Sequence, residues 1–227
     1  MTHKACVFDA YGTLFDVAAA ARALAARSET PALAGCWPAL AEDWRQKQLQ
    51  YTWLRAITDE YDSFWQLTED ALDWALERHG LAGDPPLRAD LLALYARLET
   101  YPEVPAALAA LRPTGLPLAI LSNGAPEMLD SAVQHAGLGG VFDAVLSADT
   151  PRTFKPMDAV YALVTERYAC APHEILFMSS NGWDVAGASG FGFETVWINR
   201  KGEPQDRLPH GPAHVLTDLT SLPELVS

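Results

Sequence analysis

The stretch KACVFDAYGT, residues 4–13, decides the fold. Its apolar residues 5–8 end abruptly at Asp9, and a Gly-Thr turn follows after two more residues. A short, uniformly apolar run that ends in a turn predicts a strand covered on both faces, as in a parallel sheet. A carboxylate at the tip of such a strand lies where open α/β sheets bind their ligands.

Three further runs have the same apolar character, and they span residues 118–121, 175–178 and 195–198. Helix-prone segments separate the first of these from the second: residues 125–137, which end in Ala-Gly, and residues 156–169, which begin with proline. Strands that alternate with helices predict a doubly wound α/β fold with a mostly parallel sheet.

The segment from residue 16 to residue 100 has a different pattern. It contains no strand-like run, and apolar residues recur at a spacing of four, as in Leu49, Trp53 and Ile57 or in Leu72 and Leu76. This spacing is typical of amphipathic helices. We therefore predict a helical cap domain over residues 16–100, inserted into an α/β core domain made of residues 1–15 and 101–227.

Composition narrows the possible partners and the cellular location. The net charge is −13, and no cluster of Lys and Arg suggests binding to nucleic acid. No apolar run reaches the roughly 18 residues that a membrane helix needs. The N-terminal apolar stretch is too short for a secretory signal, and the three cysteines form no Cys-x-x-Cys pair. We expect a cytoplasmic protein without nucleic-acid or membrane partners.

Polar side chains follow the predicted strands at their carboxyl ends. Any one of them has an ordinary explanation, since an aspartate or serine can cap a helix and a lysine can be a solvated surface charge. Together they predict a site, because the carboxyl ends of parallel strands meet at one edge of the sheet. The residues are Asp9, Ser122, Asn123, Lys155, Ser179, Asn181 and Asp184.

These motifs carry a resemblance to a known family. The segments DAYGT (9–13), LSNG (121–124), FKP (154–156) and SSNGWD (179–184) resemble the four motifs of the haloacid dehalogenase superfamily. The cap segment WRQKQLQYTWLR (44–55) is similar to that of one branch, the L-2-haloacid dehalogenases. The resemblance covers nearly the whole chain and implies a Rossmann-like core with an inserted cap.

Two substitutions distinguish this chain from most of the superfamily. Most members are magnesium-dependent phosphatases, with Asp-x-Asp in the first motif and Gly-Asp in the fourth. Here Tyr11 replaces the second aspartate, which protonates an alcohol leaving group, and Asn181 replaces the last carboxylate. A halide leaves without a proton, so it does not need that acid. Because magnesium prefers anionic oxygen ligands, we expect a reaction without a metal or other cofactor.

The resemblance implies hydrolysis of short L-2-haloalkanoic acids to D-2-hydroxy acids, the activity of an (S)-2-haloacid dehalogenase. Asp9 would displace halide from C2 and form an aspartyl ester, which water then cleaves. Lys155 would keep Asp9 ionised, and Asp184 would take the proton of the water. The catalytic residues that the resemblance implies are Asp9, Thr13, Arg45, Ser122, Lys155, Tyr161, Ser179, Asn181 and Asp184.

The resemblance also implies a set of contacts to the substrate anion and to the halide. Arg45, Asn123 and Trp183 would face the halide, and Ser122 with the backbone after Asp9 would hold the carboxylate. The binding residues that it implies are Ala10, Tyr11, Arg45, Gln46, Leu49, Phe64, Ser122, Asn123 and Trp183. Relatives of this kind are often homodimers, so we expect a homodimer here.

Two other functions stay open from the sequence. One is a phosphatase or phosphonatase of the same superfamily with altered metal ligation, against which Tyr11 and Asn181 count. The other is a protein without catalytic activity that binds a small acid or a partner protein through its cap. The joint retention of Asp9, Lys155 and Asp184 argues against this second alternative.

Overall fold

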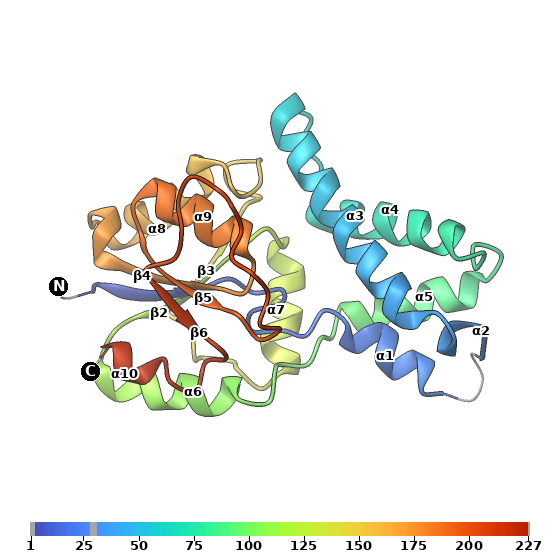
Figure 1. Ribbon diagram of the computed structural model, residues 1–227, viewed down its shortest axis with the longest axis horizontal. Helices are drawn as coiled ribbons and strands as arrows, with labels where there is room; N and C mark the ends of the chain where they lie inside the picture. The colour runs from blue at the N-terminus through green and yellow to red at the C-terminus, as the bar shows by residue number, and fades with distance from the viewer. Residues whose placement is uncertain (1–2, 28–30, 227) are drawn as a thin grey trace.

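The computed structural model describes residues 3–27 and 31–226, which form a sheet with helices on both faces and a helical unit beside it (Figure 1). Neighbouring strands of the sheet all run parallel, in the order β3-β2-β1-β4-β5-β6. The predicted doubly wound α/β fold is therefore confirmed. The strands are β1 (Ala5–Phe8), β2 (Leu118–Ser122), β3 (Ala144–Ser147), β4 (Ile175–Ser179), β5 (Glu194–Ile198) and β6 (His214–Leu216).

The central strands are buried along their whole length, as their uniformly apolar sequences predicted. Every residue of β1, β2 and β4 is buried, and Phe8 of β1 lies opposite Ile120 on one side and Met178 on the other. Asp9 follows directly, and its backbone N–H donates to the Met178 carbonyl at 2.8 Å. The register therefore brings the motifs after β1, β2 and β4 to one edge of the sheet.

Two strands were not anticipated from the sequence. They are β3 and β6, which lie at the two edges of the sheet and are only partly buried. Val145 of β3 and Val215 of β6 are exposed, and β6 is only 3 residues long. An edge strand needs no continuous apolar run, because one side of it has no neighbouring strand to cover it.

Helices cover both faces of the sheet. In Figure 1, α8 and α9 lie on one face, and α6 and α10 lie on the other. Two of these helices follow the strand ends that carry motifs, since α9 begins three residues after Ser179 and α7 begins four residues after Ser122. The helices of the core are α6 (Val104–Leu111), α7 (Pro126–His135), α8 (Asp158–Tyr168), α9 (Gly182–Phe191) and α10 (Pro223–Val226), with short 3-10 turns at Arg112–Thr114 and Pro172–Glu174.

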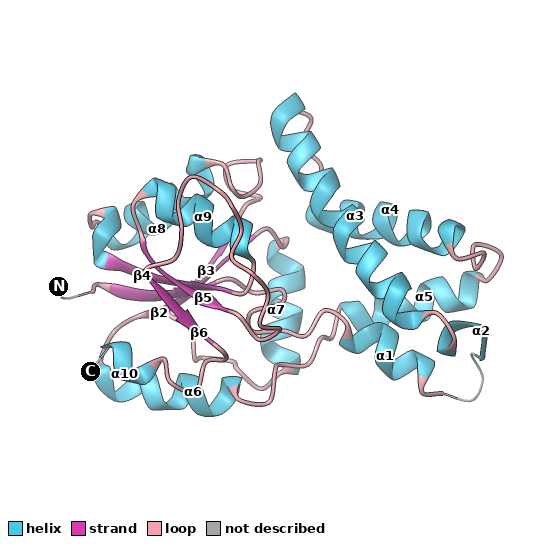
Figure 2. Ribbon diagram, viewed as in Figure 1, coloured by secondary structure: helices cyan, strands magenta, loops and turns pink. Residues whose placement is uncertain are grey.

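The predicted inserted cap is helical. Figure 2 shows that the strands lie together in one unit, whereas α1 to α5 gather in the other. Local capping sets where two of these helices begin, because Ser63 accepts the Gln66 N–H at 3.1 Å and Asp84 accepts the Leu87 N–H at 3.0 Å. The cap helices are α1 (Ala19–Ala25), α2 (Pro31–Ala34), α3 (Trp37–Thr58), α4 (Phe64–Arg78) and α5 (Pro85–Tyr95).

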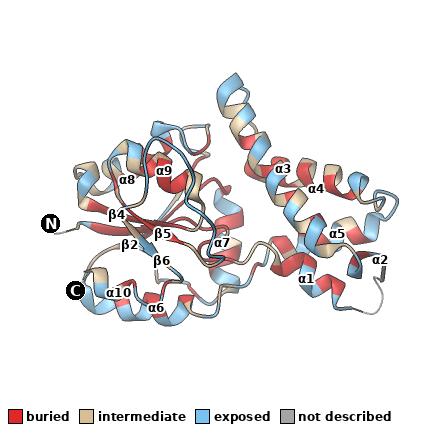
Figure 3. Cartoon of the chain, in the orientation of Figure 1, coloured by how far each residue is buried: buried red, intermediate tan, exposed pale blue. Residues whose placement is uncertain are grey.

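We predicted an apolar stripe of Leu49, Trp53 and Ile57 on α3, but this stripe is not the buried face of the helix. Ile57 is 78% exposed, and the outer end of α3 extends away from the rest of the chain (Figure 3). The buried residues of α3 lie in another stripe of spacing four, which is Leu40, Trp44, Gln48 and Thr52. The hydrophobic pattern of the sequence predicted the wrong face, because two of these four buried residues, Gln48 and Thr52, are polar. The predicted pair Leu72 and Leu76 on α4 is buried, as expected.

The cap joins the core through two chain segments that pair with each other. Phe15 and Thr100 form an antiparallel bridge, the Asp16 N–H donates to the Glu99 carbonyl at 2.9 Å, and the Tyr101 N–H donates to the Leu14 carbonyl at 3.0 Å. This pairing lies beside both predicted domain boundaries. The division of the chain at residues 15/16 and 100/101 stays a prediction.

From the sequence we expected no segment that spans a membrane, and the helices of the structure allow this expectation to be examined. Within residues 3–27 and 31–226, no helix combines the length and the apolar character needed to cross a bilayer.

Candidate active site

Asp9 lies at the centre of the predicted site and is almost fully buried. Its Oδ1 is 3.0 Å from Lys155 Nζ. Its Oδ2 accepts hydrogen bonds from Thr13 Oγ1 at 3.0 Å and from Asn181 Nδ2 at 2.9 Å. The structure therefore surrounds one carboxylate with three donors, two of which are predicted neighbours from distant motifs.

The loop after β1 gives Asp9 this position. The Ala10 carbonyl accepts backbone N–H groups of the following turn, including that of Leu14 at 2.9 Å. Gly12 has φ 89°, a left-handed conformation that favours glycine, and this lets the chain turn sharply beneath Asp9. Thr13 Oγ1 accepts the Ser180 N–H at 2.8 Å, so the turn is tied to the loop after β4.

Lys155 joins two buried carboxylates. Its ammonium lies 3.0 Å from Asp9 Oδ1 and 2.9 Å from Asp184 Oδ2, and all three side chains are at most 8% exposed. Burial alone would lower the pKa of Lys155, but the charges of Asp184 and Asp9 outweigh burial and raise this pKa above its ordinary value. The two carboxylates therefore favour the charged form of the Lys155 ammonium.

Asp184 lies in the first turn of α9 and is completely buried. Burial raises the pKa of its carboxyl above the ordinary value, and the charge of Asp9 adds to this, whereas Lys155 and the Tyr161 hydroxyl act in the opposite direction. Tyr161 on α8 donates to Asp184 Oδ1 at 2.8 Å. Tyr161 was predicted only by its position in the family pattern, and this contact gives it a partner inside the site.

Arg45 reaches the core from α3 of the cap. Its Nη2 donates to the Tyr11 carbonyl at 3.1 Å and to Asn181 Oδ1 at 3.4 Å, and its Nη1 donates to Gln48 Oε1 at 3.0 Å. A guanidinium from the cap thus meets the loops after β1 and β4. The prediction that Arg45 lies near the strand ends is in agreement with this geometry.

Gln48 and Tyr95 support Arg45 and were missed in the sequence. Gln48 is buried, donates to Thr68 Oγ1 at 2.7 Å and to the Tyr95 hydroxyl at 3.0 Å, and accepts from Arg45. A signal was present, because Gln48 is one helical turn beyond Arg45 and shares the spacing of Trp44. It was overlooked because the predicted buried stripe ran through Leu49.

The predicted apolar lining divides into an inner and an outer part. Tyr11 and Phe64 are buried, and their ring centroids lie 5.6 Å apart, with the Tyr95 ring stacked on Tyr11 at 5.8 Å. The predicted outer residues lie along the cleft instead, and they are Gln46, Leu49 and Trp183. Some of the predicted pocket residues are therefore buried in the interior, whereas others line the cleft together with Arg45.

The chain at the end of β2 carries two polar side chains and then approaches Tyr11 closely at Gly124. Ser122 Oγ accepts the Gly124 N–H at 3.1 Å, and Asn123 Oδ1 accepts the Lys155 N–H at 2.9 Å. A Cβ on Gly124 would lie 2.7 Å from Tyr11 Cε2, so only glycine fits this position without moving a buried ring. In the corresponding loop after β4, Ser179 Oγ accepts the Asn181 N–H at 3.1 Å.

A cleft of about 740 Å³ opens in front of these residues, between the cap and the core. Arg45 and Asn181 line its inner end, while Asp9 is not among its lining residues. The cleft has four basic side chains, Arg22, Arg45, Arg200 and Lys201, and four acidic ones, Asp16, Glu42, Glu203 and Asp206. Arg22, Arg200 and Lys201 pair with carboxylates, whereas Arg45 donates to uncharged oxygens of Tyr11, Gln48 and Asn181, so Arg45 is the cation best placed to attract an anion.

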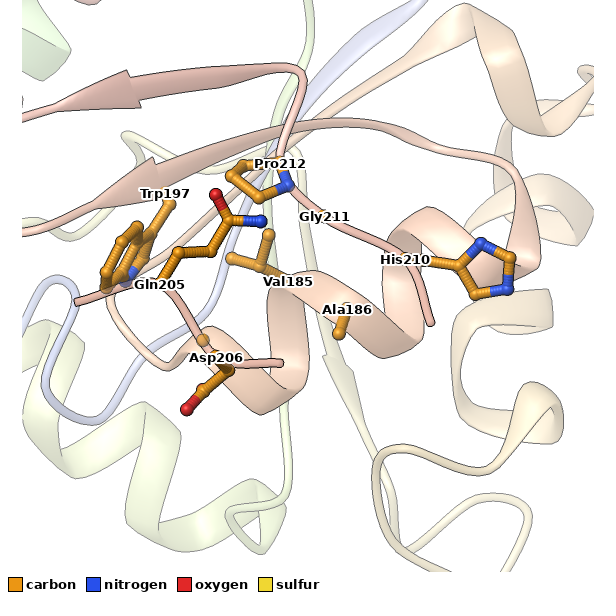
Figure 4. A pocket seen from close by; sticks show the side chains of 9 residues that line it. Val185, Ala186, Trp197, Gln205, Asp206, His210, Gly211 and Pro212 are labelled. Carbon is orange, nitrogen blue, oxygen red and sulfur yellow. The ribbon is translucent and has the colours of Figure 1, made fainter. Parts of the chain in front are cut away.

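A second, much smaller crevice lies beside α9 (Figure 4). Val185 and Ala186 of α9, Trp197 of β5 and the loop that includes Asp206 and His210 line it. Its volume of about 10 Å³ is no more than the space of one water molecule. None of the predicted site residues lines it, so the cleft rather than this crevice is the candidate substrate site.

Arg200 is another residue that the sequence analysis missed. It follows β5, and its guanidinium donates to the carbonyls of Gly12 at 3.2 Å and Thr13 at 2.9 Å. The same group pairs with Glu103 Oε1 at 2.6 Å and lies 3.9 Å from the centre of the Tyr101 ring. Arg200 therefore ties the loop of Asp9 to the chain that returns from the cap, a role with no signal in local sequence spacing.

Among the described residues, no group of three or more His, Cys, Asp or Glu side chains is placed to hold a metal ion. The expectation of a reaction without metal stays a prediction, which a chelator can test.

Comparison with known proteins gives first the class and then the family. The family model described as haloacid dehalogenase-like hydrolase matches residues 3–192 of this chain. The protein is therefore a hydrolase with an α/β core and a helical cap. The chain belongs to this haloacid dehalogenase-like hydrolase family.

Similar proteins are named for one activity within that family. The chain is 43% identical over 223 residues to (S)-2-haloacid dehalogenase 1 of Pseudomonas sp. (strain CBS-3), covering 98% of this chain and 96% of that protein. It is 48% identical over 197 residues to (S)-2-haloacid dehalogenase of Xanthobacter autotrophicus, covering 87% and 75%. A solved L-2-haloacid dehalogenase structure from Xanthobacter autotrophicus, with chloropropionic acid covalently bound, has a TM-score of 0.90 at 41% identity and covers 99% of this chain and 98% of that one.

The buried Asp184 leads to a prediction about its titration. We expect its carboxyl pKa to lie above the ordinary value of 3.8, and Tyr161→Phe to raise it further. The variant removes a donor that stabilises the ionised form, so the proton is lost only at higher pH. Carbon-13 NMR of labelled aspartate, with Asp184→Asn for assignment, measures both values. A downward shift in Tyr161→Phe would contradict the contact.

Proposed function

We propose that this protein is an (S)-2-haloacid dehalogenase, which hydrolyses short L-2-haloalkanoic acids to D-2-hydroxy acids without a metal ion. The observation that carries the proposal is the buried carboxylate of Asp9, held by Lys155 and lacking a second aspartate two residues later, where Tyr11 stands. Relatives at 43% and 48% identity are named for this activity, and a similar structure holds chloropropionic acid covalently.

The first step is a displacement at carbon. An Asp9 oxygen attacks C2 of the substrate opposite the carbon–halogen bond, and the bonding electrons leave with the halide. A new C–O bond makes an ester between Asp9 and the substrate. Since halide departs as a stable anion, no acid is needed at the position of Tyr11, and Arg45 can stabilise the negative charge that develops on the halogen.

The second step is hydrolysis of the ester. Water attacks the Asp9 carbonyl carbon and gives a proton to Asp184, whose raised pKa makes it a better base than an ordinary carboxylate. Asn181 and Ser179 orient the water. The acyl C–O bond of Asp9 breaks, so the oxygen that came from Asp9 stays bonded to C2 in the product. The alkoxide takes up a proton, Asp9 is restored as a carboxylate, and C2 has been inverted once.

The substrate anion is held by groups around this centre. Ser122 and backbone N–H groups after Asp9 bind its carboxylate, and Asn123 and Trp183 complete the halide site with Arg45. The substituent on C2 lies against the apolar lining formed by Ala10, Tyr11, Gln46, Leu49 and Phe64. Thr13 supports the nucleophile, as its 3.0 Å hydrogen bond to Asp9 suggests.

The activity can be tested with two substrates and a chelator. We expect halide release from L-2-chloropropionate at the same rate with and without EDTA, and no phosphate release from p-nitrophenyl phosphate. The reason is that Lys155 supplies the positive charge that a metal would otherwise supply. In a single turnover in oxygen-18 water, label should enter the Asp9 side chain, which mass spectrometry of the peptide detects.

Two results would contradict this proposal in different ways. Phosphate release that EDTA abolishes would support a metal-dependent phosphatase instead. Product formation with no oxygen-18 in Asp9 would exclude the ester. Asp9→Asn is the matched control, since it keeps the shape of the side chain and should fold but release no halide.

Arg45→Ala should lower kcat/KM for L-2-chloropropionate by about 10²–10³-fold, the effect of losing one donor that stabilises developing charge. The loss should fall mainly on kcat, which halide-release kinetics measure. Arg55→Ala provides the control, because Arg55 lies on the same helix and donates to the Glu60 carbonyl beyond its end. Equal losses in the two variants would place the effect in the helix rather than in the site.

We also propose that the chain is a homodimer in the cytoplasm. Exposed apolar residues on the outer half of α3, Leu54 at 51% and Ile57 at 78%, support a contact between copies. Cysteines without a Cys-x-x-Cys pair support a reducing compartment. Light scattering at micromolar concentration should give twice the mass of one chain, and Ile57→Glu should lower it. A wild-type mass of one chain would contradict the dimer.

A further inference from the structure

A further contact between cap and core lies beyond the end of α3. The residues that link α3 to α4 place Tyr61 against the core, where its hydroxyl donates to Asp149 Oδ1. Asp149 belongs to the loop after β3, 88 residues further along the chain. A hydrogen bond from a neutral donor to a carboxylate is among the stronger kinds in proteins.

The ring of Tyr61 has two further partners in the same core loop. It stacks on Phe154, with centroids 5.2 Å apart and planes inclined by 28°, and the Arg152 guanidinium lies 4.8 Å from its centre. Phe154 is completely buried and also contacts Phe64 at 6.4 Å. One cap residue thus contacts three residues of a single loop.

That loop ends in Lys155, the cation shared by the two buried carboxylates. At its start, Ser147 Oγ donates to the Gly124 carbonyl at 2.7 Å, and at its end the Lys155 N–H donates to Asn123 Oδ1 at 2.9 Å. Between these anchors, the Asp149 N–H donates to Ser147 Oγ at 3.1 Å. The core therefore fixes both ends of the loop, and Tyr61 of the cap fixes its middle.

We propose that Tyr61 is a positioning residue, which latches the cap onto the loop of Lys155 through Asp149, Arg152 and Phe154. The catalytic part of this inference rests on the proposed function, because Lys155 matters there as the partner of Asp9. Without Tyr61, the contact of Phe64 with Phe154 would remain, but the cap would hold the loop less firmly, and the Lys155 ammonium would sample positions away from Asp9.

The geometry of the cap gives the reason for such a latch. The loop that ends in Lys155 is a separate part of the core, and the cap reaches it through the Phe64 ring, which contacts Phe154, and through Tyr61. Of these two residues, Tyr61 adds a hydrogen bond to a charged side chain of the loop, Asp149. Burial first and the hydrogen bond to Asp149 second raise the pKa of Tyr61, so it keeps the proton that it donates.

The test uses Tyr61→Phe, which removes only the hydroxyl and keeps the ring that packs on Phe154. Amide hydrogen exchange is followed at Thr153 and Lys155, whose N–H groups bond to the Ala148 carbonyl and to Asn123. We expect exchange there to be faster by about tenfold, the effect of losing a hydrogen bond to a charged group. Exchange at Asp9, in the sheet core, should not change.

Catalysis provides the readout that separates positioning from stability. For L-2-chloropropionate, kcat should fall about tenfold while KM changes little, because the loss affects the Asp9–Lys155 geometry rather than substrate binding. Asp149→Ala should give the same loss, and the double variant should be no worse than either single variant. Tyr51→Phe is the control, since Tyr51 is a cap tyrosine whose ring contacts Lys47 on its own helix.

Unchanged exchange at Thr153 and Lys155 in Tyr61→Phe would overturn the latch, as would additive losses in the double variant or an equal loss in Tyr51→Phe. Failure of the proposed function is recognised separately. If the wild-type protein releases no halide, the dehalogenase proposal fails, whereas the exchange experiment uses no substrate and still decides whether the latch exists.

Discussion

The structure depends on one buried group of charges, in which Lys155 lies between Asp9 and Asp184. Removing three charges from water costs several kcal/mol per ion, and their attraction offsets this cost only when the geometry is good and other hydrogen bonds are satisfied. Here Thr13 and Asn181 donate to Asp9, and Tyr161 donates to Asp184. The fold must therefore hold these groups in one arrangement, and much of the core serves this requirement.

The parallel sheet meets this requirement by bringing distant segments to one edge. Asp9 follows β1, Asn181 follows β4, and Lys155 ends the loop after β3, so no pair of them is close in sequence. The cap adds the groups that the core lacks. Arg45 covers the inner end of the cleft, and the paired linkers with Arg200 hold the cap close to the loop of Asp9. A reaction that proceeds through an ester needs this closure, since stray water must be excluded while a chosen water is admitted.

The charges near Arg45 bear on how an acidic protein can take an anionic substrate. The overall charge of −13 opposes the approach of a haloacid, and four acidic side chains line the cleft beside its four basic ones. Fields near a binding site are governed by the nearest charges, because ions screen distant ones within about 10 Å at 0.1 M salt. The same reasoning makes Arg45 more important than its single charge suggests, since its guanidinium donates to uncharged oxygens rather than to a carboxylate.

The sequence by itself determined the central strands and the motifs at their ends, because a strand buried on both faces must be uniformly apolar and a turn must follow it. Only the tertiary structure decided the rest. The edge strands, AVLS in β3 and HVL in β6, are short and partly exposed. The buried stripe of α3 contains Gln48, which bonds to Thr68 and Tyr95 of other helices, and Thr52, which bonds to the Leu49 carbonyl of α3 itself. The contacts of Arg200 and Tyr61 likewise join segments far apart in the chain. Local sequence encodes burial and turns, whereas pairing between distant polar groups exists only once the fold has brought them together.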